Sequence, residues 1–436
     1  MKELTRLIKE DMKPALGVTE PGAIAFAVAS AVSHVEGELR KVRVALNSGM
    51  YKNAYTCGIP NSSNFGNLYA AALGALAADA KKGLESLADI TPEEDARAAR
   101  MVEMGLVEAV LDHIGSEITI DATVETEQDC CTVHIRGSHT NIVSIEKNGE
   151  EIYGDGTHLQ EVKDEAAGDA LESNELPVVH QYSLKDILNY VREVPEEEIS
   201  FIREAFSMNT ELLEEGLASE RATITKCLLK ENGGSIFSKD VLKTAQLLCN
   251  GAIEARVLGL GRPAMSITGS GAHGIIATMP LLAQYKVEGD GMEEARLWRA
   301  AALSYLITMY IKEYSGRLSA FCGCGIAAGT GMACGLAFMK GADEDAVDRV
   351  IRNMASGLTG MICDGGNHGC AMKGIVAVDA AFRAVNMALS GVSIESIHGI
   401  NGRTPEDTMR HMGMIASPGM VGTEKTIVEI MEYKFK

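Results

Sequence analysis

Long uninterrupted apolar segments are absent from this sequence. The longest apolar-rich stretches, 23–35 and 300–311, are shorter than the roughly eighteen apolar residues that a membrane-spanning helix needs. We therefore expect them to be buried helices and expect no membrane partner. The first fourteen residues also lack the apolar core of an export signal, so we expect a cytoplasmic protein.

Positive charge is scarce relative to negative charge. The chain has 40 Lys and Arg residues against 60 Asp and Glu residues, which gives a formal net charge of -20 at pH 7. A protein this acidic repels phosphate backbones and anionic lipid surfaces, which argues against nucleic-acid and membrane-surface binding. We expect its partners to be a small-molecule substrate or further copies of the chain, as in a homo-oligomer.

The common cysteine patterns of metal sites are also missing. The ten cysteines include no Cys-x-x-Cys pair and no compact ferredoxin run, which argues against a structural zinc site and an electron-transfer ferredoxin. Cysteines of a chain without an export signal are expected to be reduced. For any one of them the simplest interpretation is a small buried apolar side chain.

The first 180 residues show the patterns of both helices and strands. Two helices are predicted within residues 1–35, and others over 68–80 and 92–114. Apolar residues alternate at 42–46, 117–125, 131–135 and 142–152, with Asn148-Gly149 as a hairpin turn. We predict a mixed α/β domain over residues 1–180 with a small antiparallel sheet, which we expect to bind the substrate.

The remaining chain is dominated by helical periodicity. Apolar residues recur three and four apart in 184–194, 198–217, 241–258 and 293–314. The acidic segment 161–175 precedes them and is typical of a surface linker near a domain boundary. We therefore predict an α+β protein of two domains, the second mostly helical and spanning residues 181–436.

Four cysteines lie in unusual surroundings. Cys322 and Cys324 belong to 319–341, a segment of small residues whose backbone can approach a ligand closely, and Cys363 and Cys370 bracket a polar loop. This context favours a metal or cluster site with thiolates from two loops, although structural thiols remain the alternative. Three thiolates on a four-iron cluster would leave one iron open to act as a Lewis acid.

Three further segments are rich in polar or glycine residues. The glycine-rich segment 267–277 offers backbone N–H groups to a carboxylate or phosphate, although a tight turn explains it equally well. Residues 136–143 place four hydrogen-bonding side chains at a bend between strands, which a polar hairpin turn would also explain. Thr19 and Glu20 are typical of a helix cap.

In chain order, the motifs LGVTEP, SGMYKNAYTCGIP, RGSHTNI, GSGAHGI, CGCGIAAGTG and GMICDGGNHGC resemble those of the L-cysteine desulfidase family. That family is related to the alpha chain of iron-sulfur L-serine dehydratases. The resemblance covers nearly the whole chain. It implies an oxygen-labile [4Fe-4S] cluster held by three cysteines, and β-elimination from a small L-amino acid without pyridoxal phosphate. The products would be pyruvate, ammonia and either sulfide or water.

The resemblance also implies roles for individual residues. The cluster ligands would be Cys363, Cys370 and either Cys322 or Cys324, with Cys322 preferred. Catalysis would involve His139, Ser138 and Lys52, and the substrate would be bound by Thr140, Asn141, Asn53, Thr19, Glu20, Ser270 and Gly271.

This sequence departs from the family pattern at two places. Val18 stands where the family usually has cysteine, and Ala272 and His273 replace its usual Asn-Gln pair. These departures leave the substrate open between cysteine, serine and another small amino acid. Two other functions stay open: a hydrolase that uses the glycine-rich segment and His139, and a non-catalytic iron or redox sensor.

Overall fold

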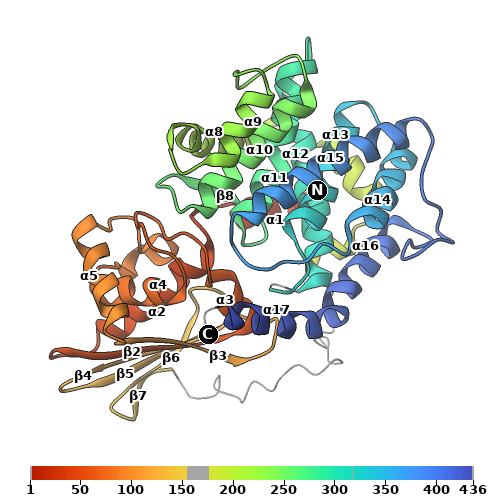
Figure 1. The fold of residues 1–436 in the computed structure, drawn as a ribbon. Coiled ribbons are helices and arrows are strands. Elements are labelled where there is room, and N and C mark those ends of the chain that lie inside the picture. The colour runs from red at the N-terminus through yellow and green to blue at the C-terminus, as the bar shows by residue number, and fades with distance from the viewer. Residues whose placement is uncertain (1, 155–175, 317, 435–436) are drawn as a thin grey trace.

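The computed structural model of the chain describes residues 2–154, 176–316 and 318–434. Figure 1 shows a sheet with its covering helices at one end and a larger bundle of helices at the other. The α+β class expected from the sequence is confirmed. The predicted linker over 161–175 lies outside the described residues.

Eight strands are described: β1 (Lys13–Leu16), β2 (Leu39–Asn47), β3 (Val107–His113), β4 (Thr119–Thr126), β5 (Cys130–Arg136), β6 (Ile142–Lys147), β7 (Glu150–Tyr153) and β8 (Pro263–Ser266). The α-helices of the first part are α1 (Lys2–Asp11), α2 (Thr19–Val32), α3 (Ser48–Ala54), α4 (Asn67–Leu76) and α5 (Pro92–Glu103). The second part has α6 (Leu184–Glu193), α7 (Glu196–Ile199), α8 (Arg203–Ala218), α9 (Thr223–Glu231), α10 (Val241–Val257), α11 (Gly271–Glu288), α12 (Glu294–Ser315), α13 (Gly329–Met339), α14 (Glu344–Leu358), α15 (Gly369–Leu389), α16 (Pro405–Met414) and α17 (Val421–Tyr433).

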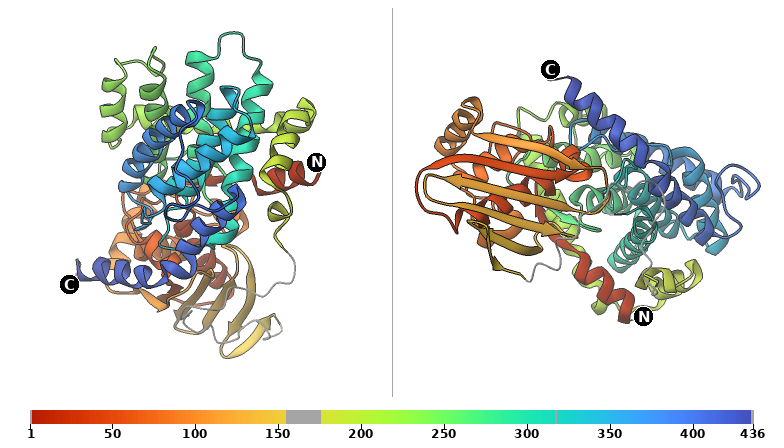
Figure 2. Two further views of the ribbon diagram at one scale, coloured as in Figure 1. Left: turned by 90° about the vertical axis from the view of Figure 1, so that its right-hand side faces the viewer. Right: turned by 90° about the horizontal axis from the view of Figure 1, so that it is seen from below.

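The larger sheet has six strands in the order β3-β2-β4-β5-β6-β7. Val42, Val44 and Leu46 alternate along β2 and are fully buried, because α2 and α4 cover this face of the sheet. The view from below in Figure 2 shows the strands in front of these helices. Asn148 and Gly149 both have positive φ angles, 54° and 84°, so the predicted hairpin turn between β6 and β7 is confirmed.

Strand β3 corrects the helix that the sequence predicted over 92–114. Helix α5 ends at Glu103, and Gly105 follows with a φ of 71°, a conformation that favours glycine and stops the helix. The chain then pairs in parallel with β2, with Val107 opposite Val42. The sheet is therefore mixed rather than purely antiparallel, because one edge strand arrives through a helical crossover.

Two four-residue strands were also missed. Strand β1 pairs antiparallel with β8, so Lys13 lies opposite Ser266. Neither segment is long enough to show a clear alternation of apolar residues. Through this pair, and through α1 against α12, the first sixteen residues contact the helical part of the chain. Helix α17 returns to contact α3. A division near residue 180 remains our interpretation of the domains.

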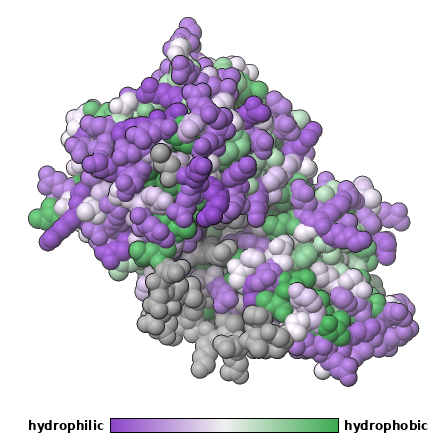
Figure 3. All heavy atoms as spheres, turned by 180° about the vertical axis from the view of Figure 1, so that it is seen from behind, coloured by the Kyte–Doolittle hydropathy of each residue, from purple (hydrophilic) through white to green (hydrophobic). Residues whose placement is uncertain are grey.

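The described helices include none that is long and apolar enough to cross a bilayer. Seen from behind, hydrophilic side chains predominate over the helical part of the surface (Figure 3). The core instead runs through alanine-rich helices such as α2 and α13, whose small side chains allow close helix contacts.

Candidate active site

A short backbone ladder joins the two cysteine-containing loops. Phe321 and Ile362 form an isolated antiparallel bridge. On either side of it, the Cys322 amide donates to the Met361 carbonyl at 3.0 Å, and the Cys363 amide donates to the Ala320 carbonyl at 2.6 Å. Two segments forty residues apart in sequence are thus held in register, which brings Cys322 and Cys363 together.

The four predicted ligand cysteines share one electrostatic environment. The Cys324 thiol donates a hydrogen bond to Cys322, which lowers the pKa of Cys322 to about 6 and raises the pKa of Cys324 well above its usual range. Burial raises the pKa of Cys370 to about 11, and the Cys363 and Cys322 thiolates contribute to the same shift. The four thiols therefore influence one another's ionisation.

Two lysines of the helical part lie beside these thiols. Burial tends to lower the pKa of Lys373, but the neighbouring Cys370 sulfur and the ion-pair partner Asp364 outweigh burial and raise it. Lys312 is only 8% exposed and its Nζ donates to the Gly316 carbonyl at 2.8 Å. Burial lowers the pKa of Lys312, against the opposing effect of the nearby Cys324 sulfur.

Lys52 connects the mixed part of the chain with the cysteine loops. It comes from α3, is fully buried, and its Nζ donates to the carbonyls of Ser319 at 3.0 Å and Cys363 at 2.9 Å. The same Nζ lies 3.2 Å from Oε2 of Glu424 on α17. Burial tends to lower the pKa of Lys52, but the Cys363 thiolate and Glu424 outweigh it, so the side chain is held as a cation.

Three more of the predicted residues come together beside Cys363. Asn53 donates from Nδ2 to Oε1 of Glu20 at 2.9 Å, and its Oδ1 lies 3.9 Å from the Cys363 sulfur. Nε2 of His139 lies 4.0 Å from the same Glu20 oxygen. Thr19 donates to the Gly269 carbonyl at 3.4 Å, which links the start of α2 to the glycine-rich segment.

Val18 lies against the loop between Cys363 and Cys370. A Cβ atom added to Gly366 would be 2.9 Å from Cγ1 of Val18, so this glycine leaves room for the valine. The Gly366 amide also donates to the Asn53 carbonyl at 3.0 Å. The residue at which this sequence departs from the family pattern is therefore in contact with the cysteine loop.

Other predicted residues make the contacts of a turn. The Asn141 side chain donates to the Arg136 carbonyl at 3.1 Å, the Asn141 amide lies 3.5 Å from the Ser138 carbonyl, and both Thr140 and Asn141 are exposed. Of the four residues 138–141, His139 is the one whose side chain lies near Glu20. These observations match the hairpin-turn alternative for Ser138, Thr140 and Asn141.

The glycine-rich segment forms the turn between β8 and α11. Ser270 precedes the first residue of α11 and makes no side-chain cap, while Gly271 lies against the guanidinium of Arg256, with only 2.8 Å from a hypothetical Cβ to Nε. Its role as a substrate-binding segment stays a prediction.

Sequence reasoning missed Lys312, Lys373 and Glu424. One signal was available, because Lys312 directly follows the apolar run 300–311, where a lysine is costly to bury without a partner. Lys373 lies three residues after Cys370 and so faces the same side of α15. The position of Glu424 depends on the return of α17 to α3, for which we find no local signal.

The described residues contain no group of three or more His, Cys, Asp or Glu side chains that could hold one metal ion. A four-iron cluster imposes a different requirement, because each thiolate binds a different iron and the sulfurs need not converge on a single point. Cysteine thiolates are the donors that such a cluster uses. The backbone ladder brings Cys322 and Cys363 together, and the four thiols share one electrostatic environment. The residues present fit the cluster.

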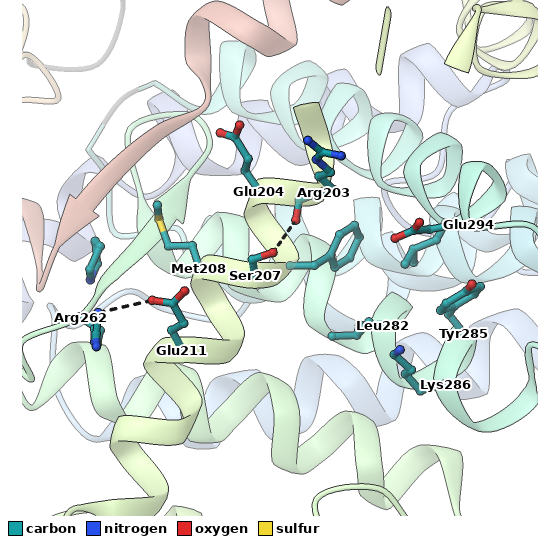
Figure 4. A pocket seen from close by; sticks show the side chains of 13 residues that line it. Arg203, Glu204, Ser207, Met208, Glu211, Arg262, Leu282, Tyr285, Lys286 and Glu294 are labelled. Carbon is teal, nitrogen blue, oxygen red and sulfur yellow. Dashed lines mark hydrogen bonds and ion pairs between the residues drawn. The ribbon is translucent and has the colours of Figure 1, made fainter. Parts of the chain in front are cut away.

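A wide surface cavity lies elsewhere. It has a volume of about 570 Å³ and is lined by residues of α8, α11 and α12, among them Arg203, Glu211 and Tyr285, and by Arg262 just before β8 (Figure 4). Arg262 already pairs with Glu211 at 3.5 Å, and both are exposed. None of the predicted site residues lines this cavity.

Comparisons with known proteins agree with the resemblance seen in the motifs. The family model of the serine dehydratase alpha chain matches residues 81–429, a range that contains all four cysteines of the loops. A UPF0597 protein of Clostridium botulinum strain Langeland is 38% identical over 431 residues, which cover 98% of each chain. UPF0597 proteins of Caldanaerobacter subterraneus and Clostridioides difficile are 35% and 32% identical, over 98% of this chain and 97% and 98% of theirs. The chain belongs to the serine dehydratase alpha chain family.

Proposed function

We propose that the chain is a lyase that catalyses β-elimination from a small L-amino acid, L-cysteine or L-serine, to pyruvate, ammonia and sulfide or water. The proposal includes a [4Fe-4S] cluster held by Cys363, Cys370 and one thiol of the Cys322–Cys324 pair. One observation carries it: thiols from two loops lie beside polar side chains from the mixed part of the chain.

Cys322 is the better third ligand. A cysteine binds iron as the thiolate, and the hydrogen bond from Cys324 lowers the pKa of Cys322 to about 6. Its sulfur also accepts from the Gly325 amide at 3.4 Å, which favours the anionic form. Bound in this way, the cluster would supply an iron without a protein ligand, a Lewis acid for the leaving sulfur or oxygen.

The buried lysines offset the negative charge that the thiolates bring. Lys52, Lys312 and Lys373 each lie within electrostatic range of at least one thiol of the site. Lys52 also fixes the Cys363 loop through two carbonyl contacts, so we assign it a positioning role. Removing any of these cations would leave buried anionic groups without compensation.

The substrate would be held by groups on both sides of the loops. Glu20 is 6% exposed and fixed by Asn53, so its carboxylate can bind the substrate ammonium. The backbone N–H groups of the first turn of α11, beginning at Gly271, suit the substrate carboxylate because a helix N-terminus attracts anions. The Ser270 amide itself already donates to the Ile267 carbonyl at 3.1 Å. His139, 4.0 Å from Glu20, would pass a proton.

The experiment is purification under anaerobic conditions, followed by assays of pyruvate and sulfide released from L-cysteine and of pyruvate released from L-serine. We expect turnover of at least one substrate, and we expect His139→Ala to keep its iron and lose turnover. Normal kinetics in that variant would mean that the turn is merely structural. A colourless protein that retains zinc would favour the hydrolase, and full iron without any turnover would favour a sensor.

A further inference from the structure

His273 occupies the first turn of α11 and reaches the cysteine loops. It is 6% exposed. A Cβ added to Gly323 would lie 2.7 Å from Nε2 of His273 and 3.1 Å from its Cε1. Gly323 separates Cys322 from Cys324, so the imidazole lies against the backbone between the two thiols. The glycine leaves the space that the ring occupies.

The hydrogen bonds of the ring decide which nitrogen carries its proton. Nδ1 of His273 lies 2.5 Å from Oγ1 of Thr268, and that hydroxyl donates to the Ile267 carbonyl at 2.7 Å. A hydroxyl has one hydrogen, and a carbonyl oxygen can only accept. The one Thr268 hydrogen can point to only one of its two neighbours. The imidazole also donates to the Ile267 carbonyl, and Nδ1 is the ring nitrogen on that side, so we place the ring hydrogen on Nδ1. In a neutral imidazole the lone pair is then on Nε2.

The surroundings keep this imidazole neutral. Burial lowers the pKa of His273 well below its usual range, and two cations strengthen the effect, Lys312 on α12 and Arg256 on α10. The thiols of Cys322 and Cys324 flank the glycine that faces its Nε2. A neutral nitrogen with its lone pair directed at a site of proposed chemistry can accept a proton.

We propose that His273 is the base that removes the α-hydrogen of the substrate through Nε2. The assignment rests on the proposed β-elimination. Nε2 takes the proton, the electrons of the Cα–H bond form the Cα=Cβ bond, and the bond from Cβ to sulfur or oxygen breaks. The leaving group departs with its electron pair. The resulting aminoacrylate reacts with water to give pyruvate and ammonia, so the atoms balance.

His180 is a matched control for this histidine. Burial also lowers the pKa of its imidazole, so the two residues share that property. However, Nε2 of His180 lies 2.8 Å from the Tyr310 carbonyl, an acceptor, and the ring stacks on Tyr314 with a centroid distance of 3.8 Å. His180 therefore donates through Nε2 and has a structural role. His180→Gln removes a half-buried imidazole without touching the cysteine loops.

The kinetic experiment compares His273→Gln with His180→Gln in iron-loaded protein. Glutamine keeps polar groups at position 273 but cannot accept a proton at neutral pH. We expect kcat of His273→Gln to fall about 100- to 10,000-fold, the range for loss of a general base, with KM changed less than about threefold. The remaining turnover should show a primary isotope effect with α-deuterated substrate. Turnover within threefold of the wild type at equal iron content would overturn the assignment.

A second measurement does not depend on activity. Nitrogen chemical shifts of the full-length, metal-free protein labelled with ¹⁵N-histidine, with His273→Gln used to assign the signal, report which nitrogen is protonated. We expect Nδ1–H and an unprotonated Nε2 at neutral pH; an Nε2–H tautomer would overturn the assignment. An iron-loaded wild type that turns over no small L-amino acid would overturn the proposed function instead. The nitrogen shifts would still decide the tautomer, so the two failures are distinguishable.

Discussion

Two groups of thiols in the helical part of the chain differ in their surroundings rather than in their burial. Cys249 and Cys334 lie within α10 and α13, are fully buried, and have a pKa raised chiefly by burial among neighbouring side chains. Cys322 is also buried, at 4% exposure, yet its pKa is lowered to about 6 because the Cys324 thiol and the Gly325 amide donate to it. Burial alone therefore does not separate a core thiol from a ligand.

The difference arises from backbone geometry. A thiol inside a helix has neighbours whose amides are already bonded to other carbonyls, so nothing compensates a thiolate. At Cys322 the Gly325 amide and the Cys324 thiol favour the anion, whereas burial still raises the pKa of Cys370, in the first turn of α15, to about 11. The comparison predicts that substitutions of the four predicted ligand cysteines affect iron binding. Substitutions of Cys249 and Cys334 should affect packing alone.

The largest effect is expected from Cys363→Ser. Serine removes a thiolate that the cluster requires, so iron and acid-labile sulfide should fall to background in anaerobically purified protein. Cys334→Ser is the matched control, because its thiol is fully buried within α13 and its pKa is raised by burial, and it should retain its iron and colour. Equal iron content in wild type and Cys363→Ser would contradict the ligand assignment.

Lys52→Met tests whether this buried cation stabilises the fold around the two cysteine-containing segments. The substitution leaves Glu424 buried without its partner and removes the donor to two loop carbonyls. We expect a loss of about 3–5 kcal/mol in the free energy of unfolding, measured by urea denaturation. Adding Glu424→Gln should recover part of that loss. A single variant within 1 kcal/mol of the wild type would show that the ion pair is not important for stability.

Gly323→Ala tests the close packing around the glycine that separates Cys322 from Cys324. Its Cβ would meet the His273 ring and Cδ of Lys312 at 3.1 Å, so we expect a loss of about 1–3 kcal/mol from overpacking and reduced turnover. In the control, Gly357→Ala, the new methyl group meets no atom within 4 Å, and helix propensity should stabilise the protein by about 0.5–1 kcal/mol. Similar melting curves for the two variants would contradict the close contact.

Val18→Cys should change stability least, by less than about 1.5 kcal/mol, because the two side chains are similar in size and apolar character. Its effect should appear in chemistry, since a thiolate can accept a proton or bind iron and valine can do neither. We expect weak sulfide release from L-cysteine in the wild type and an increase in Val18→Cys at equal iron loading. Strong wild-type release, unchanged in the variant, would show that position 18 is not catalytic.

The sequence predicted much of this arrangement because its signals are local. The Asn148-Gly149 turn, the alternation in β2 and the start of α2 near Thr19 follow from patterns within a few residues. Strand β3 was mistaken for a continuation of α5, because its identity depends on parallel pairing with a distant strand. The short strands β1 and β8 depend on each other in the same way.

The sequence predicted those residues of the site that lie close together in one motif. Cys363 and Cys370 stand at the two ends of one short segment, the second at the start of α15, and Lys52 and Asn53 are neighbours on α3, so each pair could be recognised from the sequence. The contact of Lys52 with Glu424 joins residues more than 370 positions apart, and no local pattern encodes it. The tautomer of His273 likewise depends on its contacts with Thr268 and the Ile267 carbonyl, whose geometry the sequence does not specify.

Iron and acid-labile sulfide analysis of the anaerobically purified wild-type protein tests the central claim most directly. The account predicts about four iron and four sulfide per chain, the content of one [4Fe-4S] cluster, and loss of both on exposure to air. A folded protein that contains zinc or no metal when prepared without oxygen would contradict it.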